Sequence, residues 1–500
     1  MRTSSYLIYV DLPNDQDQML LVHGYTGAYD KVSKRVATYV RSLETRRAPK
    51  PLYGEWTAEP TVDGKAEPPS DETIQVLRRR GYLTDMTLER EEQFFHQVVG
   101  KIHDKNLKQP PGYLFMPTYN CNLRCAYCFQ DHMRTNPLYN HLLRTMSREM
   151  VDRIFEGIKK IEERHGFVEN GTPRWRGIGF FGGEPLLAAS RDIVQYIMEK
   201  ALSMGKAGFW GVSNATEIDA YQDLLGPDKI ARLQVTLDGV PTEHDKRRIY
   251  ADGSGSWERI SKNITMALEH SVYISVRINL DRNNIDQLPL MAQIFEDQGW
   301  DKSPYFSAYT APIHAVNDNV QRTTTMDSWE LDQTLKEMQR QMPILAKIIG
   351  PDDAIKDRAR ALFDKPEANV PQLKESFCSA HSSMYIFDAF ADIYACWERT
   401  GDSNTRIGHI QQDGTLLMNS DLVKMWRDRT VSTNPVCTKC RYALYCGGGC
   451  AVLAVGKTGK YHMNFCDGYA SRFRASVAEA YVDHASGVAV QAKAARVCDQ

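Results

Sequence analysis

Three closely spaced cysteines are the first residues whose type and arrangement could do chemistry. They are Cys121, Cys125 and Cys128, and the next cysteine is Cys378. With 11 cysteines in 500 residues, chance would produce three at these offsets about 0.005 times per chain. Three thiolates on one tight loop suit three irons of a cubane [4Fe–4S] cluster and leave the fourth iron without a protein ligand. Zinc is the alternative, and it would need a fourth ligand, for which His132 is the nearby candidate.

A second group of cysteines lies near the C-terminus, and Cys498 stands alone in the tail. Two groups separated by a cysteine-free stretch favour two metal-bearing modules over scattered buried cysteines. A zinc ribbon is the alternative for this second group. Its members are Cys378, Cys396, Cys437, Cys440, Cys446, Cys450 and Cys466.

Composition limits the classes of protein to which the chain can belong. A length of 500 residues predicts about three structural units. The formal net charge of -2 gives no electrostatic argument for a nucleic-acid partner. No apolar run reaches the length of a membrane span, and the N-terminus carries charges where a signal peptide has its apolar core. We therefore expect a cytoplasmic protein without a membrane partner, in which cysteines serve metal binding or catalysis.

Residues 113 to about 310 alternate short apolar runs with amphipathic segments. This pattern predicts repeated strand–helix units around a parallel sheet. Such sheets place their chemistry at the carboxyl ends of the strands, where the cysteine loop and the residues after the other strands would meet. One expected helix covers 150–161, and the expected strands cover 113–117, 178–181, 209–213, 233–237, 273–280 and 305–309.

The flanking segments have patterns of their own. The first 95 residues predict strands over 6–10 and 19–25, a helix over 30–43, a Pro-rich loop and a helix over 74–80. Residues 311–377 predict a helical connector, with Leu331, Leu335 and Met338 on one face. We expect five parts: an N-terminal domain (1–100), a strand–helix domain (108–310), the connector (311–377), a cysteine-rich domain (378–470) and a C-terminal helix or tail (471–500).

Gly182-Gly183-Glu184-Pro185 follows the second expected strand. Together with the cysteine loop after the first strand, it resembles the radical S-adenosylmethionine (SAM) superfamily. The resemblance implies an α/β fold with a partial (β/α)6 TIM-type barrel, and a [4Fe–4S] cluster on Cys121, Cys125 and Cys128 that binds SAM. In that family the GGEP segment meets the amino group of SAM. Paired glycines allow close backbone approach, and a carboxylate can accept from an ammonium.

Further residues match positions of the same family. Tyr127 occupies the aromatic position beside the adenine, and Ser213 with Asn214 occupies a position that often contacts the ribose or the methionine carboxylate. Asp238 lies in a stretch resembling peptide-modifying members and is also assigned to cofactor binding. The same stretch continues with His244, Asp245 and Arg247, and Arg277 with Asn279 recurs on the fifth strand. Each of these residues has an alternative interpretation as packing, capping or framework.

The C-terminal cysteines resemble the SPASM domain, which carries two auxiliary [4Fe–4S] clusters in radical SAM enzymes. The resemblance assigns one complete cluster to Cys437, Cys440, Cys446 and Cys466, and three ligands of another to Cys378, Cys396 and Cys450. Seven thiolates cannot close two four-ligand cubanes, and Cys498 and His381 are the candidates for a further ligand. The chain departs from the SPASM pattern at Ala391, where a glycine is usual.

The N-terminal pattern resembles the small winged-helix module, similar to the pyrroloquinoline-quinone chaperone, with which many maturases grip the leader of a ribosomally made precursor peptide; a structural cap is the alternative. The resemblances imply a maturase that forms a 5′-deoxyadenosyl radical, abstracts hydrogen from a precursor peptide and installs an intramolecular crosslink. A flavodoxin or ferredoxin would donate electrons. The alternatives are an anaerobic sulfatase-type maturase that makes formylglycine, and a non-catalytic metal-binding peptide carrier.

Overall fold

The computed structural model describes residues 1–45, 66–167, 175–314, 323–350, 353–366 and 370–487. Its centre is a large sheet in which six neighbouring strands run parallel in chain order. This confirms the expected α/β organisation around a parallel sheet. The six strands are β6 (Gly112–Phe115), β7 (Trp175–Phe180), β8 (Lys206–Ser213), β9 (Ile230–Thr236), β10 (Tyr273–Leu280) and β11 (Phe306–Pro312).

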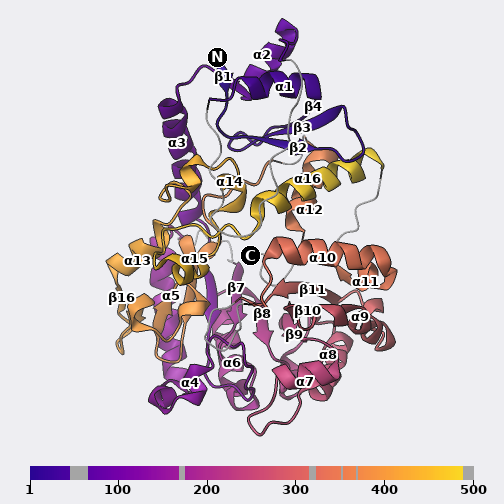
Figure 1. Ribbon diagram of the computed structural model, residues 1–500. Helices are drawn as coiled ribbons and strands as arrows, with labels where there is room; N and C mark the ends of the chain where they lie inside the picture. Colours follow the sequence, from indigo (N-terminus) through magenta and orange to yellow (C-terminus); the bar gives the residue numbers. More distant parts are fainter. Residues whose placement is uncertain (46–65, 168–174, 315–322, 351–352, 367–369, 488–500) are drawn as a thin grey trace.

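Helices connect these strands and cover the sheet (Figure 1). The expected helix over 150–161 is the middle of α5, which starts after Ser147, whose side chain accepts a hydrogen bond from the Met150 amide. Its buried face, with Ile154 and Ile158, joins the core beneath the strands. The others are α6 (Arg191–Ser203), α7 (Pro241–Arg247), α8 (Trp257–Glu269) and α9 (Leu288–Asp297), with α5 at Arg148–Arg164.

The sheet extends at both edges beyond the expected strands. Strand β12 (Ile349–Gly350) lies parallel to β11, and β13 (Met384–Phe387) lies parallel to β6. An antiparallel run then continues through β14 (Asp392–Tyr394), β15 (Arg406–Ile410) and β16 (Leu416–Met418). One continuous sheet therefore crosses from the strand–helix region into the cysteine-rich region.

The N-terminal region forms a separate antiparallel sheet with the order β2, β3, β4, over Leu7–Asp11, Gln18–His23 and Tyr29–Ser33. The expected helix over 30–43 is wrong for its first four residues. Residues 30–33 belong to β4 and pair with β3, and α1 (Lys34–Ser42) begins where the Ser33 side chain accepts from the Val36 amide. The expected helix over 74–80 is α2 (Asp71–Arg79), and a long helix, α3 (Leu88–Leu107), follows it without having been expected.

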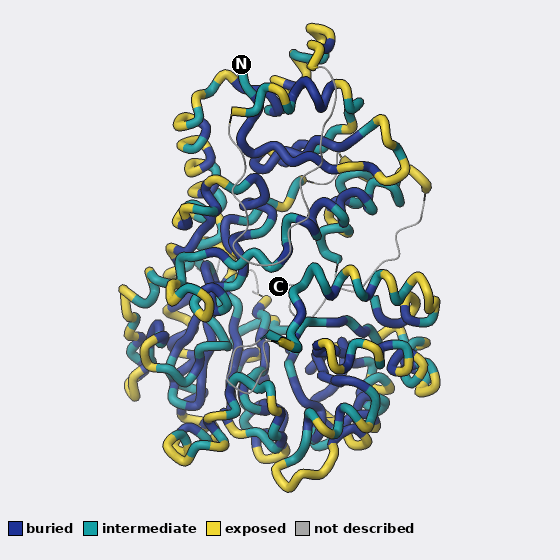
Figure 2. Tube along the Cα trace, viewed as in Figure 1, coloured by how far each residue is buried: buried dark blue, intermediate teal, exposed yellow. Residues whose placement is uncertain are grey.

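The two faces of this N-terminal sheet pack against different partners. On one face of the sheet, Leu21 packs against α1. On the opposite face, Leu20, Val22 and Ile8 pack against Tyr445 and Phe473 in the C-terminal part of the chain. Helices α12 (Ala354–Asp364) and α16 (Tyr469–Ala485) therefore lie between the small sheet and the large one (Figure 1), and the trace in this layer alternates between buried and intermediate segments (Figure 2).

The connector is helical as expected, with α10 (Ser328–Gln341), α11 (Pro343–Ile348) and α12, and Leu331 and Leu335 are buried. The remaining helices are α4 (His132–Thr135), α13 (Ser420–Arg427), α14 (Ala443–Cys446) and α15 (Ala451–Thr458), and a two-stranded ladder joins β1 (Arg2–Thr3) to β5 (Leu83–Thr84). Within the described ranges, no helix is both long enough and apolar enough to cross a membrane.

Candidate functional site

The cysteine loop lies directly after β6, at the carboxyl end of the parallel strands. Backbone hydrogen bonds close the loop, from Cys128 to Cys125 and from Arg124 to Ile249. Burial raises the pKa of Cys125 to about 12; Arg248 lowers that pKa, and the thiols of Cys121 and Cys128 raise it. The three thiols are therefore close enough for their charges to interact.

Polar side chains hold these thiols from two sides. The Arg134 guanidinium donates to the Cys128 sulfur at 3.1 Å, and the Asn214 amide lies 3.7 Å from the Cys121 sulfur. Both donors favour the thiolate form that an iron ligand needs. By contrast His132, the candidate zinc ligand, packs its ring edge-on against Tyr139.

The glycines after β7 contact the segment that leads into the cysteine loop. A Cβ at Gly183 would stand 2.2 Å from the Asn120 carbonyl, and one at Gly182 would stand 2.5 Å from the Thr118 carbonyl. The Gly183 amide donates to Thr118, and the Glu184 amide donates to Asn120. Only glycine therefore allows the ends of β6 and β7 to approach this closely.

The Glu184 carboxylate is buried and joins the ends of β7 and β8. It accepts from the Ser213 hydroxyl at 2.8 Å, the Asn214 amide at 2.6 Å and the Leu186 amide at 2.9 Å. Burial raises its pKa to about 7, against the lowering effect of these donors. The sequence predicts that Glu184 accepts from an ammonium; in the structure three of the roughly four acceptor sites of its carboxylate are used to brace the strand ends, and Pro185 beside it is buried.

Tyr127 is the centre of a polar cluster under the cysteine loop. Its hydroxyl is hydrogen-bonded to Asp238, accepts from Arg248 at 2.7 Å and accepts from the Asn279 side-chain amide at 3.2 Å. Asp238 also accepts from the Asn279 backbone amide at 3.0 Å. The hydroxyl is therefore fixed, and Tyr127 connects the loop to the ends of β9 and β10.

The other residues of the Asp238 stretch stabilise the framework. His244 accepts from the Asp238 amide, and Asp245 accepts from the amides of Ser256 and Trp257, where α8 begins. Arg247 pairs with Asp281 at 3.1 Å. These side chains hold α7 in place through contacts within the protein.

Four C-terminal thiols come together in the structure. Burial raises the pKa of Cys437 well above its ordinary value, and the thiols of Cys440, Cys446 and Cys466 raise it further. Gly447 and Gly449, on either side of the turn after Cys446, both have positive φ and leave no room for a Cβ against Ser376 and Phe465. The glycine run therefore lets this loop fold tightly between neighbouring backbones.

Three further thiols form a second C-terminal group. Burial raises the pKa of Cys396, and the thiols of Cys378 and Cys450 add to that rise. His381, a candidate for a further ligand, has both ring nitrogens engaged, because Nδ1 lies 2.8 Å from the Trp426 carbonyl and Nε2 lies 3.3 Å from Arg429. Cys498, the other candidate, lies outside the described residues.

The cysteines of the described residues are all free thiols. Across the described part of the chain, no three side chains of the metal-binding types converge on one point as ligands of one metal ion would, and the ten cysteines described there form no disulfide. In a cubane each iron takes its own thiolate, so the sulfurs stand further apart than around one ion. Thiolates are the donors that such a cluster requires, so the donor type of each group is compatible with one.

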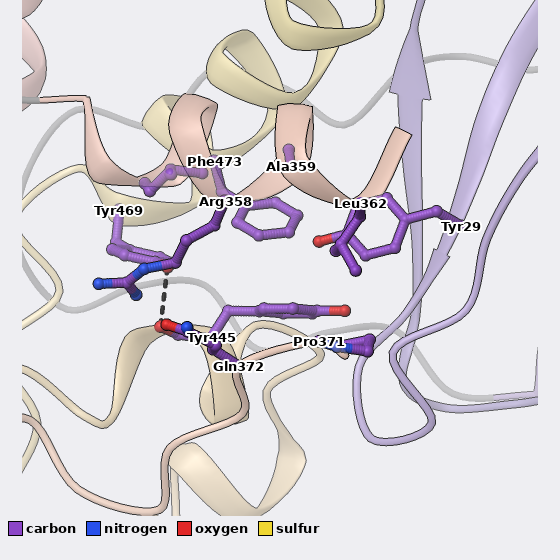
Figure 3. A pocket seen from close by; sticks show the side chains of 10 residues that line it. Tyr29, Arg358, Ala359, Leu362, Pro371, Gln372, Tyr445, Tyr469 and Phe473 are labelled. Atoms are coloured by element: carbon purple, nitrogen blue, oxygen red, sulfur yellow. Dashed lines mark hydrogen bonds between the residues drawn. The ribbon is translucent and has the colours of Figure 1, made fainter. Parts of the chain in front are cut away.

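An aromatic pocket lies between the N-terminal sheet and the C-terminal helices, apart from the strand-end site (Figure 3). Its cavity volume is about 30 Å³, so it is a small, tightly lined space. The Tyr469 hydroxyl, on α16, donates to the Tyr445 carbonyl at 2.8 Å. Tyr29 of β4 forms another wall, so this pocket borders both the edge strand and the four-thiol group.

Several side chains at the site carry no motif and were not identified from the sequence. Arg134, Arg248 and Trp397 are such residues. The Trp397 ring stacks on Phe181, with 5.5 Å between the ring centroids. Phe181 follows β7 and Trp397 follows Cys396, so this stack joins the strand-end site to the three-thiol group. An arginine within a few residues of a motif was the one signal available for Arg134 and Arg248.

Comparison with known proteins agrees with this geometry. Residues 115–293 match the model of the radical SAM superfamily. The chain is 21% identical over 346 residues to the cysteine-type anaerobic sulfatase-maturating enzyme of Clostridium novyi (strain NT), covering 66% of this chain and 85% of that protein. It is 22% identical over 365 residues to the antilisterial bacteriocin subtilosin biosynthesis protein AlbA of Bacillus subtilis (strain 168), covering 70% and 69%.

A solved structure has the same fold. Native anSMEcpe with bound AdoMet and Cp18Cys peptide superposes with a TM-score of 0.55 at 16% identity, covering 76% of this chain and 100% of that chain. The matched segment begins inside β6 and contains the cysteine loop, the glycines after β7 and the Tyr127 cluster. The chain is therefore an enzyme with a radical SAM domain over residues 115–293, similar to a sulfatase-maturating enzyme and to a bacteriocin biosynthesis protein.

Proposed function

We propose that this enzyme is a SPASM-type peptide maturase that abstracts hydrogen from a ribosomally made precursor peptide and installs an intramolecular crosslink. The observation that carries the proposal is the meeting of three thiols, the Gly182–Gly183 turn and the Tyr127 cluster at one edge of the parallel sheet. The likeness to the subtilosin biosynthesis protein supports a peptide as the substrate.

Cys121, Cys125 and Cys128 would hold a [4Fe–4S] cluster whose fourth iron binds SAM. The donor set fits, because three thiols with supporting donors from Arg134 and Asn214 stand on one short loop. When bound, the cluster and SAM supply a 5′-deoxyadenosyl radical, which is the hydrogen-abstracting reagent. The strands around them would form the partial (β/α)6 barrel that encloses this site.

The surrounding residues position the cofactor. Residues 182–185, Ser213 and Asn214 would line the strand ends where SAM would lie. The Glu184 carboxylate also holds those ends together through Ser213 and Asn214. Tyr127 would pack its ring beside the adenine while Asp238, Arg248 and Asn279 fix its hydroxyl. A buried, fixed site of this kind excludes water and competing hydrogen donors.

The C-terminal region would be a SPASM domain with two auxiliary [4Fe–4S] clusters, making three in all. Cys437, Cys440, Cys446 and Cys466 would ligate one cluster fully, which fits their mutual proximity. Cys378, Cys396 and Cys450 would give the other cluster three ligands, which leaves one iron for a further ligand. The five expected parts of the chain follow this assignment, with 378–470 as the auxiliary-cluster domain.

The N-terminal region, residues 1–100, would be the leader-recognition domain. Among the described residues, β4 pairs with β3 along one side and with no strand along its other side. A leader peptide could add there as a further strand through main-chain hydrogen bonds. Tyr29 on this edge strand also lines the aromatic pocket, so the edge lies beside the C-terminal helices. An electron donor such as flavodoxin or ferredoxin would complete the set of partners.

The decisive experiment is a mass spectrum of a precursor peptide encoded beside this enzyme and expressed together with it. A crosslink or oxidation removes two hydrogens, so the modified peptide is about 2 Da lighter. The matched control is the enzyme in which Cys121, Cys125 and Cys128 are all replaced by alanine. The proposal fails if the peptide mass is unchanged with the parent enzyme, or if the triple variant produces the same loss.

A second function is favoured by the sulfatase-maturating relative, which the chain covers over 85% of that protein's length. The enzyme would then oxidise a Cys or Ser side chain of a sulfatase to formylglycine. An aldehyde-reactive hydrazide probe separates the two functions, because formylglycine forms a hydrazone and a crosslink does not. Labelling of a sulfatase peptide, with no change in any neighbouring precursor, would replace the first proposal by the second.

A further inference from the structure

Arg429 is a buried side chain that the proposed chemistry does not use. It follows α13, and 4% of its surface is exposed. Its guanidinium donates to the carbonyls of Tyr461 at 2.6 Å, Met463 at 2.8 Å and Gly449 at 3.0 Å. It also lies 3.3 Å from Nε2 of His381. Five donors in a rigid fork therefore hold Arg429 in one orientation.

These partners belong to segments that carry both groups of C-terminal thiols. Gly449 lies between Cys446 of the four-thiol group and Cys450 of the three-thiol group. Met463 precedes Cys466 by three residues, and His381 follows Cys378 by three. The side chain of Arg429 thus lies between the two groups and is bonded to the backbone or side chains of each.

No carboxylate neutralises this guanidinium. Among the described residues, Arg429 forms no ion pair with Asp or Glu, and His381 is neutral because burial lowers its pKa to about 3. The groups near Arg429 that can become negative are thiols. Burial lowers the pKa of Arg429, whereas the thiols of Cys437, Cys378, Cys450 and Cys446 raise it. A buried charge without a partner is costly, so a counter-charge is required.

We propose that Arg429 is the shared counter-charge of the two auxiliary clusters and raises the reduction potential of each. This inference rests on the proposed function, which supplies the clusters. A cubane with thiolate ligands is anionic, and one-electron reduction makes it more so. A fixed positive charge between two such anions therefore stabilises the reduced form of both, because Coulomb energies are large in a buried, low-dielectric region.

Arg427 offers a matched comparison. It is buried on the same segment and donates to the carbonyls of Ser379, Ala380 and Met384. Burial lowers its pKa, and among the thiols Cys378 alone opposes that effect. Its charge therefore acts on the three-thiol group and not on the four-thiol group.

The test uses full-length protein with Cys121, Cys125 and Cys128 replaced by alanine, so that the auxiliary clusters alone remain. After anaerobic reconstitution, an EPR-monitored redox titration compares this parent with Arg429→Gln, Arg429→Lys and Arg427→Gln. Arg429→Gln is expected to lower the equilibrium constant for one-electron reduction of each cluster at least tenfold. This corresponds to a reduction potential lower by about 59 mV. Arg429→Lys should keep most of the potential, and Arg427→Gln should shift only one signal.

Unchanged potentials in Arg429→Gln at full iron content would overturn the proposal. If Arg429→Gln does not load iron, the iron content of Arg429→Lys decides. Normal loading in Arg429→Lys would support a required positive charge. Loss of iron in both variants would assign Arg429 a purely structural role and overturn the proposal. A parent with far less than about eight irons per chain would instead contradict the proposed function. The two failures are thus distinguishable by iron analysis.

Discussion

Ala391 shows at the scale of one residue why a family pattern prefers glycine. It lies between β13 and β14, is fully buried and has a φ of 61°. Its amide donates to Asp388, and its carbonyl accepts from Ile410. A Cβ in this left-handed conformation costs about 1–2 kcal/mol. The left-handed backbone at position 391 therefore explains why glycine is usual there, and Ala391 departs from that pattern.

We expect Ala391→Gly to raise the free energy of unfolding by up to about 1 kcal/mol, because the relief of strain exceeds the greater flexibility of glycine in the unfolded chain. Anaerobic urea denaturation would measure the change. Ala389→Gly is the control, since Ala389 is equally buried but has no positive φ; it should lose about 1 kcal/mol. Equal losses in both variants would show that Ala391 is unstrained.

His23 gives stability a dependence on pH. Its Nδ1 accepts from the amides of Tyr25 and Thr26, and burial lowers its pKa to about 4. The folded state therefore holds neutral His23, whereas the unfolded state takes up a proton near pH 6.5. Stability is full above the unfolded pKa and falls as pH drops through this window, by about 2 kcal/mol between about pH 7 and about pH 5.

His23→Asn removes this titration while its side-chain oxygen can still accept from the two amides. The measurement is the free energy of unfolding of parent and variant at several pH values. Their difference should shrink as the solution is acidified, because the parent alone loses stability at this site. A difference that stays constant between the two pH values would be inconsistent with a neutral buried His23.

At the residue scale, candidate residues can be singled out from the sequence where chemistry imposes a motif. The cysteines were found in advance because each thiol group has its own spacing, and the structure brings the same thiols together. Arg248 and Arg134 were not found, because a guanidinium reaches its partner through the fold and has no fixed sequence offset. The hydrogen-bond donors that Glu184 has in the structure were missed for the same reason, since its three donors lie on two different strand ends.

At the scale of elements, the glycines after β7 decide how closely two strand ends approach. We expect Gly183→Ala to displace the segment before Cys121, because its Cβ would lie 2.2 Å from the Asn120 carbonyl. The measurement is iron per reconstituted chain, which should fall by about four, the content of one cubane.

Gly100→Ala is the matched control for this substitution. Gly100 lies in α3 with nothing within 4 Å of the position that an added methyl group would take, so alanine should stabilise the helix by up to about 1 kcal/mol and leave the iron content unchanged. Full iron content in Gly183→Ala would mean that the cysteine loop tolerates the displacement.

Elements were predictable where a strand repeats a simple pattern. Strand β10 has the expected bounds, over which apolar residues alternate with polar ones. The polar residues of β4 are half exposed and lack the alternation of a buried strand, so the sequence favours a helix there. Strand β13 joins the sheet beside β6 across more than 250 residues of chain, and no local pattern can indicate a pairing over such a separation.

At the scale of the whole molecule, the N-terminal sheet and the C-terminal helices share a core. The Tyr445 hydroxyl donates to the His23 carbonyl at 3.1 Å, and the Tyr6 hydroxyl donates to the Thr438 carbonyl at 2.6 Å. The proposed leader-binding sheet is therefore attached to the loop that bears the four-thiol group.

Substitutions at Leu20 and Leu21 can distinguish the shared core from the core that belongs to the N-terminal sheet alone, because Leu20 lies in the first and Leu21 in the second. Leu20 faces α16 and Leu21 faces α1. Either change to alanine should cost about 2–5 kcal/mol, but Leu20→Ala alone should increase hydrogen exchange in α16. Mass-spectrometric exchange over 469–485 measures this, with Leu21→Ala as the control. Equal protection of α16 in both variants would contradict a shared core.

The central claim is that the Cys121, Cys125 and Cys128 loop holds a cluster with an iron open to SAM. Its most direct test is 5′-deoxyadenosine formed by anaerobically reconstituted enzyme with SAM and a strong reductant, followed by chromatography and mass spectrometry. We predict steady formation by the parent and none by the variant with alanine at all three positions. No product from the parent, or equal product from both proteins, would contradict the account.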